Sequence, residues 1–369
     1  MGCALANALG KRDIGVVVVE RGDICSGSSG KNAGGVRQQF STATNAKYAK
    51  RSIEGIRALE CELGADFAFR QSGYLFLAST DATMSLLERA AQVQNAHGIP
   101  TEVLSPGGVA DRVPMARTDD VVGGSYCPTD GYLDPHSLVS ALAANARRSG
   151  VTILEHERVV EISARGGSTR TVATESGRGI DCRVICNTAG VWAPDIAMML
   201  GMQLPIRPWR SQLFVLTEVA GMTDELPMVI DFDNGRTVFH PFGPDLLVGS
   251  DAEGPGVLAW DTAFEWDHVA AVAERVVRRI PSAATAQVST GWAGLLELTP
   301  DDNPIVGWLV EDDVYVAAGF SGHGLSLAPG IADDVAAELM GEVPALDMTD
   351  YRPARFEHSR GGAEALSLR

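Results

Sequence analysis

The sequence predicts an α/β fold, α+β overall, in which a helix-covered parallel sheet alternates along the chain with a mixed or antiparallel sheet. The alanine-rich residues 2–11 predict a helix, and a turn then leads into the apolar strand 16–20, VVVVE. Residues 183–187 and 314–318 are again short apolar strands, and each precedes a glycine-containing loop. Closely spaced strands typical of an antiparallel sheet are expected at 212–216, 237–242 and 246–250.

The remaining elements indicate two interleaved domains. Further helices are expected at 42–63, 84–97, 137–148, 266–280 and from the last glycine loop to about Met340. Further strands are expected at 73–79, 151–154 and 159–162. Residues 1–72, 135–203 and 288–345 would form the first domain, residues 73–134 and 204–287 the second, and residues 346–369 a C-terminal tail.

Composition excludes several classes of partner. The 369-residue chain is 45% hydrophobic, and its net charge of −17 opposes binding to nucleic acid. The six cysteines form no CxxC pair and no zinc-ligand spacing, so we expect reduced thiols and no metal site. No apolar run reaches the roughly 20 residues of a transmembrane helix, and the start shows no basic leader or cleavage site. These features predict a cytoplasmic protein.

The first segment matches the later part of a dinucleotide-binding motif. Gly2 opens the first helix and Glu20 ends the following strand, 18 residues further on. An acid about 20 residues after the glycines holds the ribose hydroxyls in a Rossmann-like fold. The earlier glycines and the first strand of the motif are missing from the sequence. We therefore expect a Rossmann-like domain without its first strand, in which the two neighbouring strands keep unpaired edges.

Two glycine-rich loops are suited to binding phosphate and a ring system. Residues 26–37, SGSSGKNAGGVR, offer small side chains, hydroxyls and free backbone N–H groups directly after the ribose acid. Residues 319–324, GFSGHG, precede a helix whose positive end could face a ligand. In that position the helix dipole would stabilise negative charge on a reduced flavin.

Six ordered motifs strongly resemble those of a known family. They are VVVVERG, GSSGKNAGGVRQQF, QSGYLF, NTAGVWA, GLLELTPDDNPIVG and AAGFSGHGLSLAPG. The set resembles the FAD-dependent amine oxidoreductases related to D-amino acid oxidase. Within them it is most similar to the branch of sarcosine oxidase, glycine oxidase and amino-acid dehydrogenase β-subunits. The resemblance runs from Gly2 to about Met340 and implies an FAD-binding domain interleaved with a substrate domain.

The resemblance implies a set of FAD-binding residues along the whole chain. Contacts with the adenosine and pyrophosphate would come from Gly2, Glu20, Arg21, Ser28, Ser29, Val159, Ala189, Gly190 and Trp192. The flavin and its ribityl chain would lie near Asn32, Ala33, Gly34, Gly294, Asp302, Gly319, Phe320, Ser321, Gly322, His323, Gly324 and Leu325.

Departures from the family pattern bear on FAD attachment and on the substrate. Some relatives tether FAD through a cysteine just before the TPD sequence, but residues 291–297 contain none. Others have a histidine in the early loop, where this chain has Asn32. We therefore expect noncovalent FAD. The lysine that helps monomeric sarcosine oxidases bind the substrate carboxylate falls at Ser326, which argues against strict sarcosine specificity.

The mechanism that we expect is hydride transfer from the α-carbon of a small amine or amino acid to flavin N5, followed by hydrolysis of the imine. Secondary amines and substrates resembling glycine, sarcosine or proline fit the resemblance. Arg37 is the first candidate for pairing a substrate carboxylate, because a guanidinium can do so bidentately. His240 is the second candidate, followed by Tyr74 and His323.

Two alternatives and several partners stay open at this point. The chain could be a flavin-dependent 2-hydroxy-acid dehydrogenase, which shares the fold, or a noncatalytic subunit that has lost FAD. Electrons could pass to oxygen, to a quinone or to a partner subunit in a hetero-oligomer.

Overall fold

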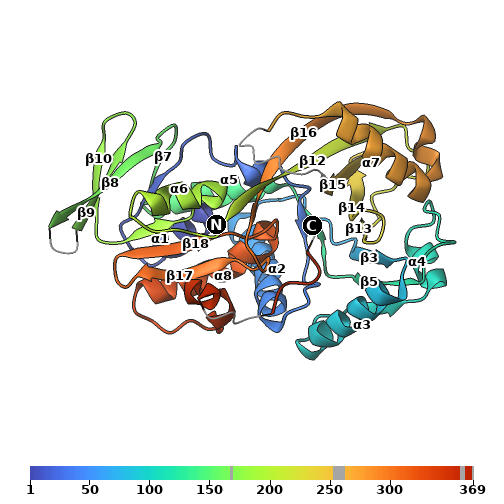
Figure 1. Ribbon diagram of the computed structural model, residues 1–369, viewed down its shortest axis with the longest axis horizontal. Helices are drawn as coiled ribbons and strands as arrows, with labels where there is room; N and C mark the ends of the chain where they lie inside the picture. Colours follow the sequence, from blue (N-terminus) through green and yellow to red (C-terminus); the bar gives the residue numbers. More distant parts are fainter. Residues whose placement is uncertain (167–168, 252–261, 358–361, 368–369) are drawn as a thin grey trace.

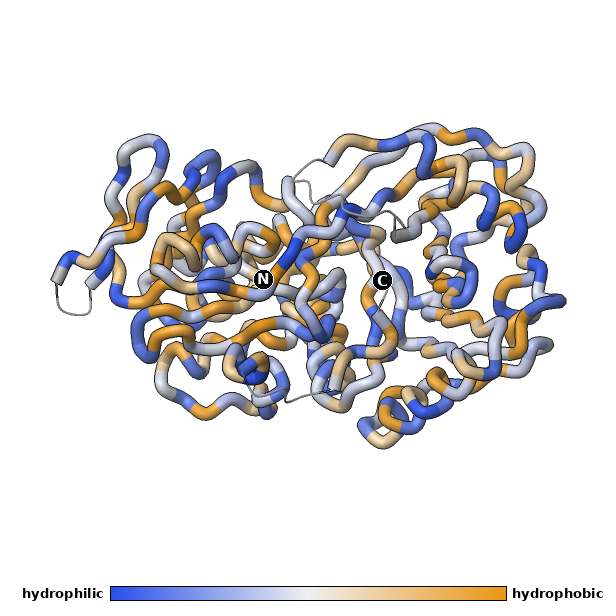
Figure 2. Tube along the Cα trace, viewed as in Figure 1, coloured by the Kyte–Doolittle hydropathy of each residue, from blue (hydrophilic) through white to orange (hydrophobic). Residues whose placement is uncertain are grey.

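A computed structural model describes residues 1–166, 169–251, 262–357 and 362–367 of the chain. The ribbon divides into two parts, one built on short parallel strands and the other on a large sheet (Figure 1). Apolar segments gather along the strands and the inner helices, and polar segments gather in the outer loops (Figure 2). The predicted α/β class, α+β overall, is confirmed.

The large part of the fold is an eight-stranded sheet with the order β16-β12-β15-β14-β13-β3-β5-β4. Its neighbours pair antiparallel except for β13 and β3, which are parallel. The strands are β3 (Tyr74–Ala78), β4 (Glu102–Leu104), β5 (Gly123–Cys127), β12 (Arg207–Thr217), β13 (Met228–Asp231), β14 (Thr237–Phe242), β15 (Asp245–Asp251) and β16 (Gln287–Leu298). This is the mixed sheet that the sequence predicts for the second domain. Its strand β16 begins at the boundary expected for the return to the first domain, yet it pairs with β12.

The nucleotide-binding part consists of two separate small parallel pairings. Strand β1 (Val17–Val19) pairs with β7 (Thr152–Leu154), and β11 (Ile185–Asn187) pairs with β18 (Val314–Ala318). Strand β17 (Ile305–Val310) extends the second sheet. Within the described residues, β1 and β11 each have a strand on one edge only. Val17 in β1 is 44% exposed.

Helices cover the small sheets and join the two parts. They are α1 (Gly2–Gly10), α2 (Ala43–Leu63), α5 (Pro135–Arg148), α6 (Ala193–Met198) and α8 (Gly324–Leu339). Thr42 caps the start of α2 through its side chain, and Gly64 ends that helix in the left-handed conformation at φ 59°. The apolar faces of α1, α2 and α8 share one core cluster. The antiparallel hairpins β8 (Val159–Gly166), β9 (Thr169–Thr174) and β10 (Gly179–Cys182) project from this part (Figure 1).

The outer helices α3 (Asp81–Ala96), α4 (Pro106–Arg112) and α7 (Trp266–Arg279) flank the eight-stranded sheet, and β2 (Gly35–Val36) pairs with β6 (Gly131–Tyr132) beside it. The inner face of α7 packs on the sheet in a second core cluster. None of the helices in the described ranges is long and apolar enough to cross a membrane.

Candidate active site

A cavity of about 1770 Å³ lies where the two parts of the fold meet. Its walls come from β1, β11 and the helices α1 and α8, and from one end of the eight-stranded sheet. Pockets for single drug-sized ligands span roughly 300–1,000 Å³, so this cavity has room for a dinucleotide and a small substrate. Its position beyond the carboxyl ends of β1 and β11 is where open α/β sheets bind ligands.

The N-terminal end of α1 faces the cavity with its backbone N–H groups. Met1 is the N-cap residue and supplies no side-chain hydrogen bond, and the first turn contains no acid. A Cβ atom added at Gly2 would lie 3.0 Å from Thr188 Oγ1, so any larger residue would require the Thr188 side chain to shift. The free N–H groups and the helix dipole make this end of α1 suited to a phosphate.

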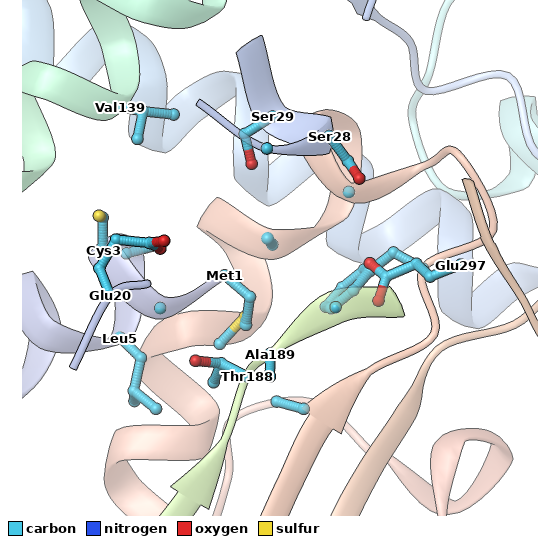
Figure 3. Close-up of a pocket in the computed structure, with 18 of the residues that line it drawn as sticks. Met1, Cys3, Leu5, Glu20, Ser28, Ser29, Val139, Thr188, Ala189 and Glu297 are labelled. Carbon is cyan, nitrogen blue, oxygen red and sulfur yellow. The ribbon is translucent and has the colours of Figure 1, made fainter. Parts of the chain in front are cut away.

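An acid and a cation–π pair lie at the adenosine end. Glu20 follows β1 directly, and its Oε1 accepts a hydrogen bond of 2.8 Å from the backbone N–H of Gly22. Figure 3 shows Glu20 beside Cys3, at the edge of the cavity. The guanidinium of Arg21 lies 3.9 Å from the centroid of the Trp192 ring. This arrangement gives an aromatic face beside a carboxylate, which suits a nucleoside.

The early serine loop is held in shape by its own side chains. Ser28 and Ser29 lie on a short 3-10 helix at the cavity wall (Figure 3). The Oδ1 atom of Asn32 accepts from the backbone N–H of Gly34 at 2.6 Å, and its Nδ2 donates to the carbonyl of Ser29. Asn32 therefore fixes the loop with both ends of its amide group.

The late glycine loop is held by a half-buried acid that the sequence analysis did not single out. Glu297, near the end of β16, accepts a hydrogen bond of 2.8 Å from the backbone N–H of Gly319. Burial raises the pKa of Glu297, while backbone hydrogen bonds from Gly319 and Phe320 act in the opposite direction. Figure 3 shows the Glu297 side chain at the cavity, across from Ala189. The sequence signal that could have identified Glu297 is an acid within the apolar run GLLEL.

Arg37 is buried at the opposite end of the cavity without a carboxylate partner. It is 3% exposed, and no Asp or Glu in the described ranges forms an ion pair with it. Its Nη2 donates to the carbonyl of Leu366 at 2.7 Å, and its Nη1 donates to the carbonyl of Gln39. Burial lowers the pKa of Arg37, with weaker opposing effects of nearby Tyr74, Glu364 and Asp130. A buried cation that lines a cavity and has no direct ion pair within the described residues favours an anionic ligand.

Two residues with uncharged aromatic rings, His323 and Tyr74, lie near Arg37. The Nε2 atom of His323 lies 3.3 Å from Arg37 Nη2, and burial together with that cation lowers the pKa of His323 well below its usual range. Burial raises the pKa of Tyr74 to about 12. At neutral pH, therefore, His323 is an uncharged imidazole and Tyr74 keeps its phenolic proton. Both residues line the cavity, as does Arg37.

His240 is the predicted substrate residue that the structure places elsewhere. Its ring nitrogens lie 2.7 Å from the carbonyl oxygen of Pro241 and 2.8 Å from that of Ala33, and the ring stacks on Tyr132. Burial lowers the pKa of His240 to about 4. His240 is not among the residues that line the cavity, and its ring lies against the backbone of the serine loop, so substrate contact by His240 stays a prediction.

All but four of the predicted cofactor residues line the cavity; those four are Gly34, Asp302, Gly319 and Ser321. Each has a positive φ, between 50° and 75°. Gly34 shows the reason: a Cβ atom there would lie 2.2 Å from the carbonyl oxygen of Leu133. These positions therefore shape the loops, and direct contact of the four residues with the cofactor stays a prediction.

A family model for FAD-dependent oxidoreductases, with the short name DAO, matches residues 1–338. The chain belongs to this family of FAD-dependent oxidoreductases. The resemblance inferred from the six motifs is thus confirmed, and FAD is the cofactor of the family.

Similar proteins include several amine and amino-acid oxidoreductases. The chain is 28% identical to 4-methylaminobutanoate oxidase (formaldehyde-forming) of Paenarthrobacter nicotinovorans, over 98% of this chain and 45% of that protein. It is 27% identical to mouse mitochondrial sarcosine dehydrogenase, over 97% of this chain and 40% of that protein. The chain thus spans less than half the length of these relatives. The crystal structure of L-proline dehydrogenase from P. horikoshii matches with a TM-score of 0.90 and 31% identity, over 97% and 96% of the two chains.

The residues present fit FAD. The open end of α1 would hold the pyrophosphate, Glu20 the ribose and the Arg21–Trp192 pair the adenine. The N-terminal end of α8 would face the flavin, because its N-cap residue His323 forms no side-chain cap and residues 322–326 line the cavity. No group of His, Cys, Asp and Glu side chains suited to a metal ion occurs in the part of the chain that the structure describes.

Proposed function

We propose that the chain catalyses the FAD-dependent oxidation of a small amine or amino acid whose carboxylate binds Arg37. The observation that carries this proposal is the buried guanidinium of Arg37, which lines the cavity and, among the described residues, has only carbonyl oxygens within hydrogen-bond distance as oxygen acceptors. Carbonyl oxygens orient a guanidinium but form no ion pair with it. A substrate carboxylate would supply a direct ion pair.

The uncharged neighbours of Arg37 support an amine substrate. The imidazole of His323 stays neutral because burial and Arg37 disfavour its protonation. It therefore brings no second positive charge against a substrate nitrogen. The phenol of Tyr74 can donate a hydrogen bond at neutral pH, since its pKa is raised to about 12. Together these groups would bind and orient an amino acid in a site with little water.

Bound FAD supplies the electron acceptor for removal of a hydride from the carbon that carries the nitrogen. Glu297 and Asn32 would hold the two loops that surround the flavin. We further propose that FAD is bound noncovalently, because residues 291–297 contain no cysteine and Asn32 stands where some relatives have a histidine.

The substrate class is proposed from the chemistry shared by the relatives. The names of three of them refer to 4-methylaminobutanoate, sarcosine and L-proline. Each of these compounds carries a secondary amine and a carboxylate. A carboxylate-binding arginine beside neutral aromatic rings is compatible with all three.

The test is anaerobic bleaching of the bound flavin by a substrate panel. The panel contains sarcosine, L-proline, glycine and 4-methylaminobutanoate, with lactate and 2-hydroxyglutarate as competitors that carry a carboxylate but no amine. Bleaching by one of the amines and by neither hydroxy acid supports the proposal. Bleaching by the hydroxy acids alone would identify a 2-hydroxy-acid dehydrogenase, and a purified chain that stays colourless with excess FAD would identify a noncatalytic subunit. Hydrogen peroxide yield in air separates an oxidase from an enzyme that uses a quinone or a partner subunit.

A further inference from the structure

Residues 362–367, which we call the C-terminal strap, are packed between the two parts of the fold. Leu366 is fully buried and shares an apolar cluster with Tyr74, Phe76 and Met228 from strands β3 and β13. Glu364 is 3% exposed. In Figure 1 the last described residues run between α2 and the large sheet. A segment with this burial contributes to the interior of the molecule.

Hydrogen bonds fix the strap on both sides. The carboxylate of Glu364 accepts from the backbone N–H of Ser41 and from Asn45 Nδ2, each at 2.9 Å. On the other side, the backbone N–H of Glu364 donates to the carbonyl of Asp301 at 3.0 Å. Asn303 Nδ2 donates to the carbonyl of Gly362 at 3.0 Å. The strap thus connects the start of α2 with the loop after β16.

The strap reaches the substrate end of the cavity through the main chain of Leu366. The carbonyl of Leu366 accepts the 2.7 Å hydrogen bond from Arg37 Nη2. The N–H of the same residue donates to Glu364 Oε1 at 3.0 Å, so the peptide on either side of Leu366 has little freedom. The Leu366 side chain at the same time packs against Tyr74 and Met228, which line the cavity.

The Arg37 guanidinium is restrained by two aromatic rings and by two backbone carbonyls. It lies 4.2 Å from the Phe40 ring centroid and 5.3 Å from that of Phe76, and these contacts set its height above the rings. Rotation in its own plane is limited by the carbonyls of Gln39 and Leu366. A bidentate pair with a carboxylate requires a fixed orientation in that plane.

We propose that the C-terminal strap is a positioning segment of the substrate site, in which the Leu366 carbonyl orients Arg37 for the substrate carboxylate. This inference rests on the proposed role of Arg37. Glu364 acts through Leu366, and Leu366 acts through Arg37, so neither residue is catalytic. The strap therefore sets carboxylate affinity, whereas the pyrophosphate and the ribose of FAD would be held by the end of α1 and by Glu20.

The experiment uses the FAD-loaded protein and titration calorimetry with acetate, with acetamide as the uncharged control ligand. Glu364→Ala and Leu366→Ala are expected to raise the Kd of acetate about 10- to 100-fold, because small displacements of an orienting group can cost about 10² in a site of this kind. The matched control is Glu357→Ala, an exposed acid close by in the sequence. This control should bind acetate as the wild type does.

A second measurement separates positioning from unfolding. Hydrogen exchange of the Leu366 amide should be slow in the wild type and fast in Glu364→Ala, while the ratio of FAD to protein stays at the wild-type value. Unchanged acetate affinity in Glu364→Ala and Leu366→Ala would overturn the inference, as would an equal loss of FAD and acetate. If Leu366→Ala fails to fold, Leu366→Val provides the milder change. Absence of acetate binding in the wild type itself would instead reject the proposed role of Arg37, and the inference with it.

Discussion

Individual residues at the cavity carry charges whose states are set mainly by burial. The same desolvation that keeps His323 neutral leaves Arg37 charged, because a guanidinium gives up its proton only far above neutral pH. The sequence predicts Arg37 as the carboxylate-binding residue from its chemistry and its position after a glycine loop. It could not predict that Arg37 has no direct ion pair within the described residues, since that depends on which distant side chains surround it.

His240 shows why the direction of a side chain is hard to predict. The strand containing it is predicted almost residue for residue, as 237–242. The face on which each side chain lies depends on strand register and on the residues across the sheet. The ring points to the Ala33 carbonyl, where it supports the loop from behind.

His240 should also make the protein less stable in mild acid. The pKa of His240 is lowered from 6.5 to about 4, so the unfolded chain takes up a proton more readily between these pH values. Stability is unaffected by this residue above pH 6.5, falls as the pH drops, and is lower by about 3 kcal/mol near pH 4. Denaturant unfolding of wild type and His240→Gln across this range measures the effect. The variant should lose less stability on acidification.

Asp130 changes the pH dependence of stability in the opposite direction from His240. The wild type must therefore be compared with His240→Gln. Burial raises the pKa of Asp130 to about 6, so its contribution to stability is present at low pH and is lost as the pH rises through that value. The difference between wild type and His240→Gln removes this common contribution. Parallel pH profiles of the two proteins would contradict the assignment of the acid sensitivity to His240.

At the scale of elements, the contact between α2 and α8 positions the end of α8 that faces the flavin. The backbone N–H of Gly330 in α8 donates to Ser52 Oγ in α2 at 2.8 Å. A Cβ atom at Gly330 would lie 2.4 Å from the Tyr48 carbonyl oxygen. Both helices are predicted from their apolar spacing. Their close approach follows from Gly330 and Ser52 together, a pairing that spans 278 residues and that no local pattern reveals.

Gly330→Ala is therefore expected to destabilise the protein by about 1–3 kcal/mol through overpacking. Gly55→Ala is the matched control in α2, because its Cβ atom would meet nothing within 4 Å. That substitution should stabilise the helix by about 0.5–1 kcal/mol. Thermal unfolding of the two variants should move in opposite directions from the wild type. A stabilising Gly330→Ala would show that the helices can separate without cost.

The strands and helices along the chain are predicted only in part. Alternating strands and helices identify the nucleotide-binding part, and the strands of the second sheet are mostly predicted. Strand β16 is not predicted, because its glycines and polar residues obscure the alternation of apolar residues over 287–298. The strap is not predicted either, since residues 362–367 show no periodicity and their burial depends on cavities formed by distant segments.

At the scale of the whole molecule, the cofactor cavity lies between parts of the fold that share few strand pairings. Strands β1 and β11 belong to separate sheets, and both contribute to the cavity wall. FAD would contact the first helix, the serine loop and the late glycine loop at once. Binding a ligand only to the folded state stabilises that state by mass action.

Free FAD at about 1,000 times its Kd is therefore expected to add about 4 kcal/mol to the free energy of unfolding and to raise Tm by several degrees. Differential scanning calorimetry at increasing FAD concentration measures this. Adenosine monophosphate serves as a control that can occupy only part of the cavity and should raise Tm less. A Tm independent of FAD concentration would mean that the cavity does not bind FAD in the folded protein.

The most direct test of the pairing between Arg37 and the substrate carboxylate changes both partners, one in the enzyme and one in the substrate. The rate measured is that of single-turnover anaerobic flavin reduction. Wild type and Arg37→Gln are each reduced by the best amino acid of the panel and by the same amine without its carboxylate. The pairing of Arg37 with the carboxylate predicts a coupling of about 2–5 kcal/mol, so that the variant slows the amino acid strongly and the plain amine little. Equal slowing of both substrates by Arg37→Gln would contradict the account.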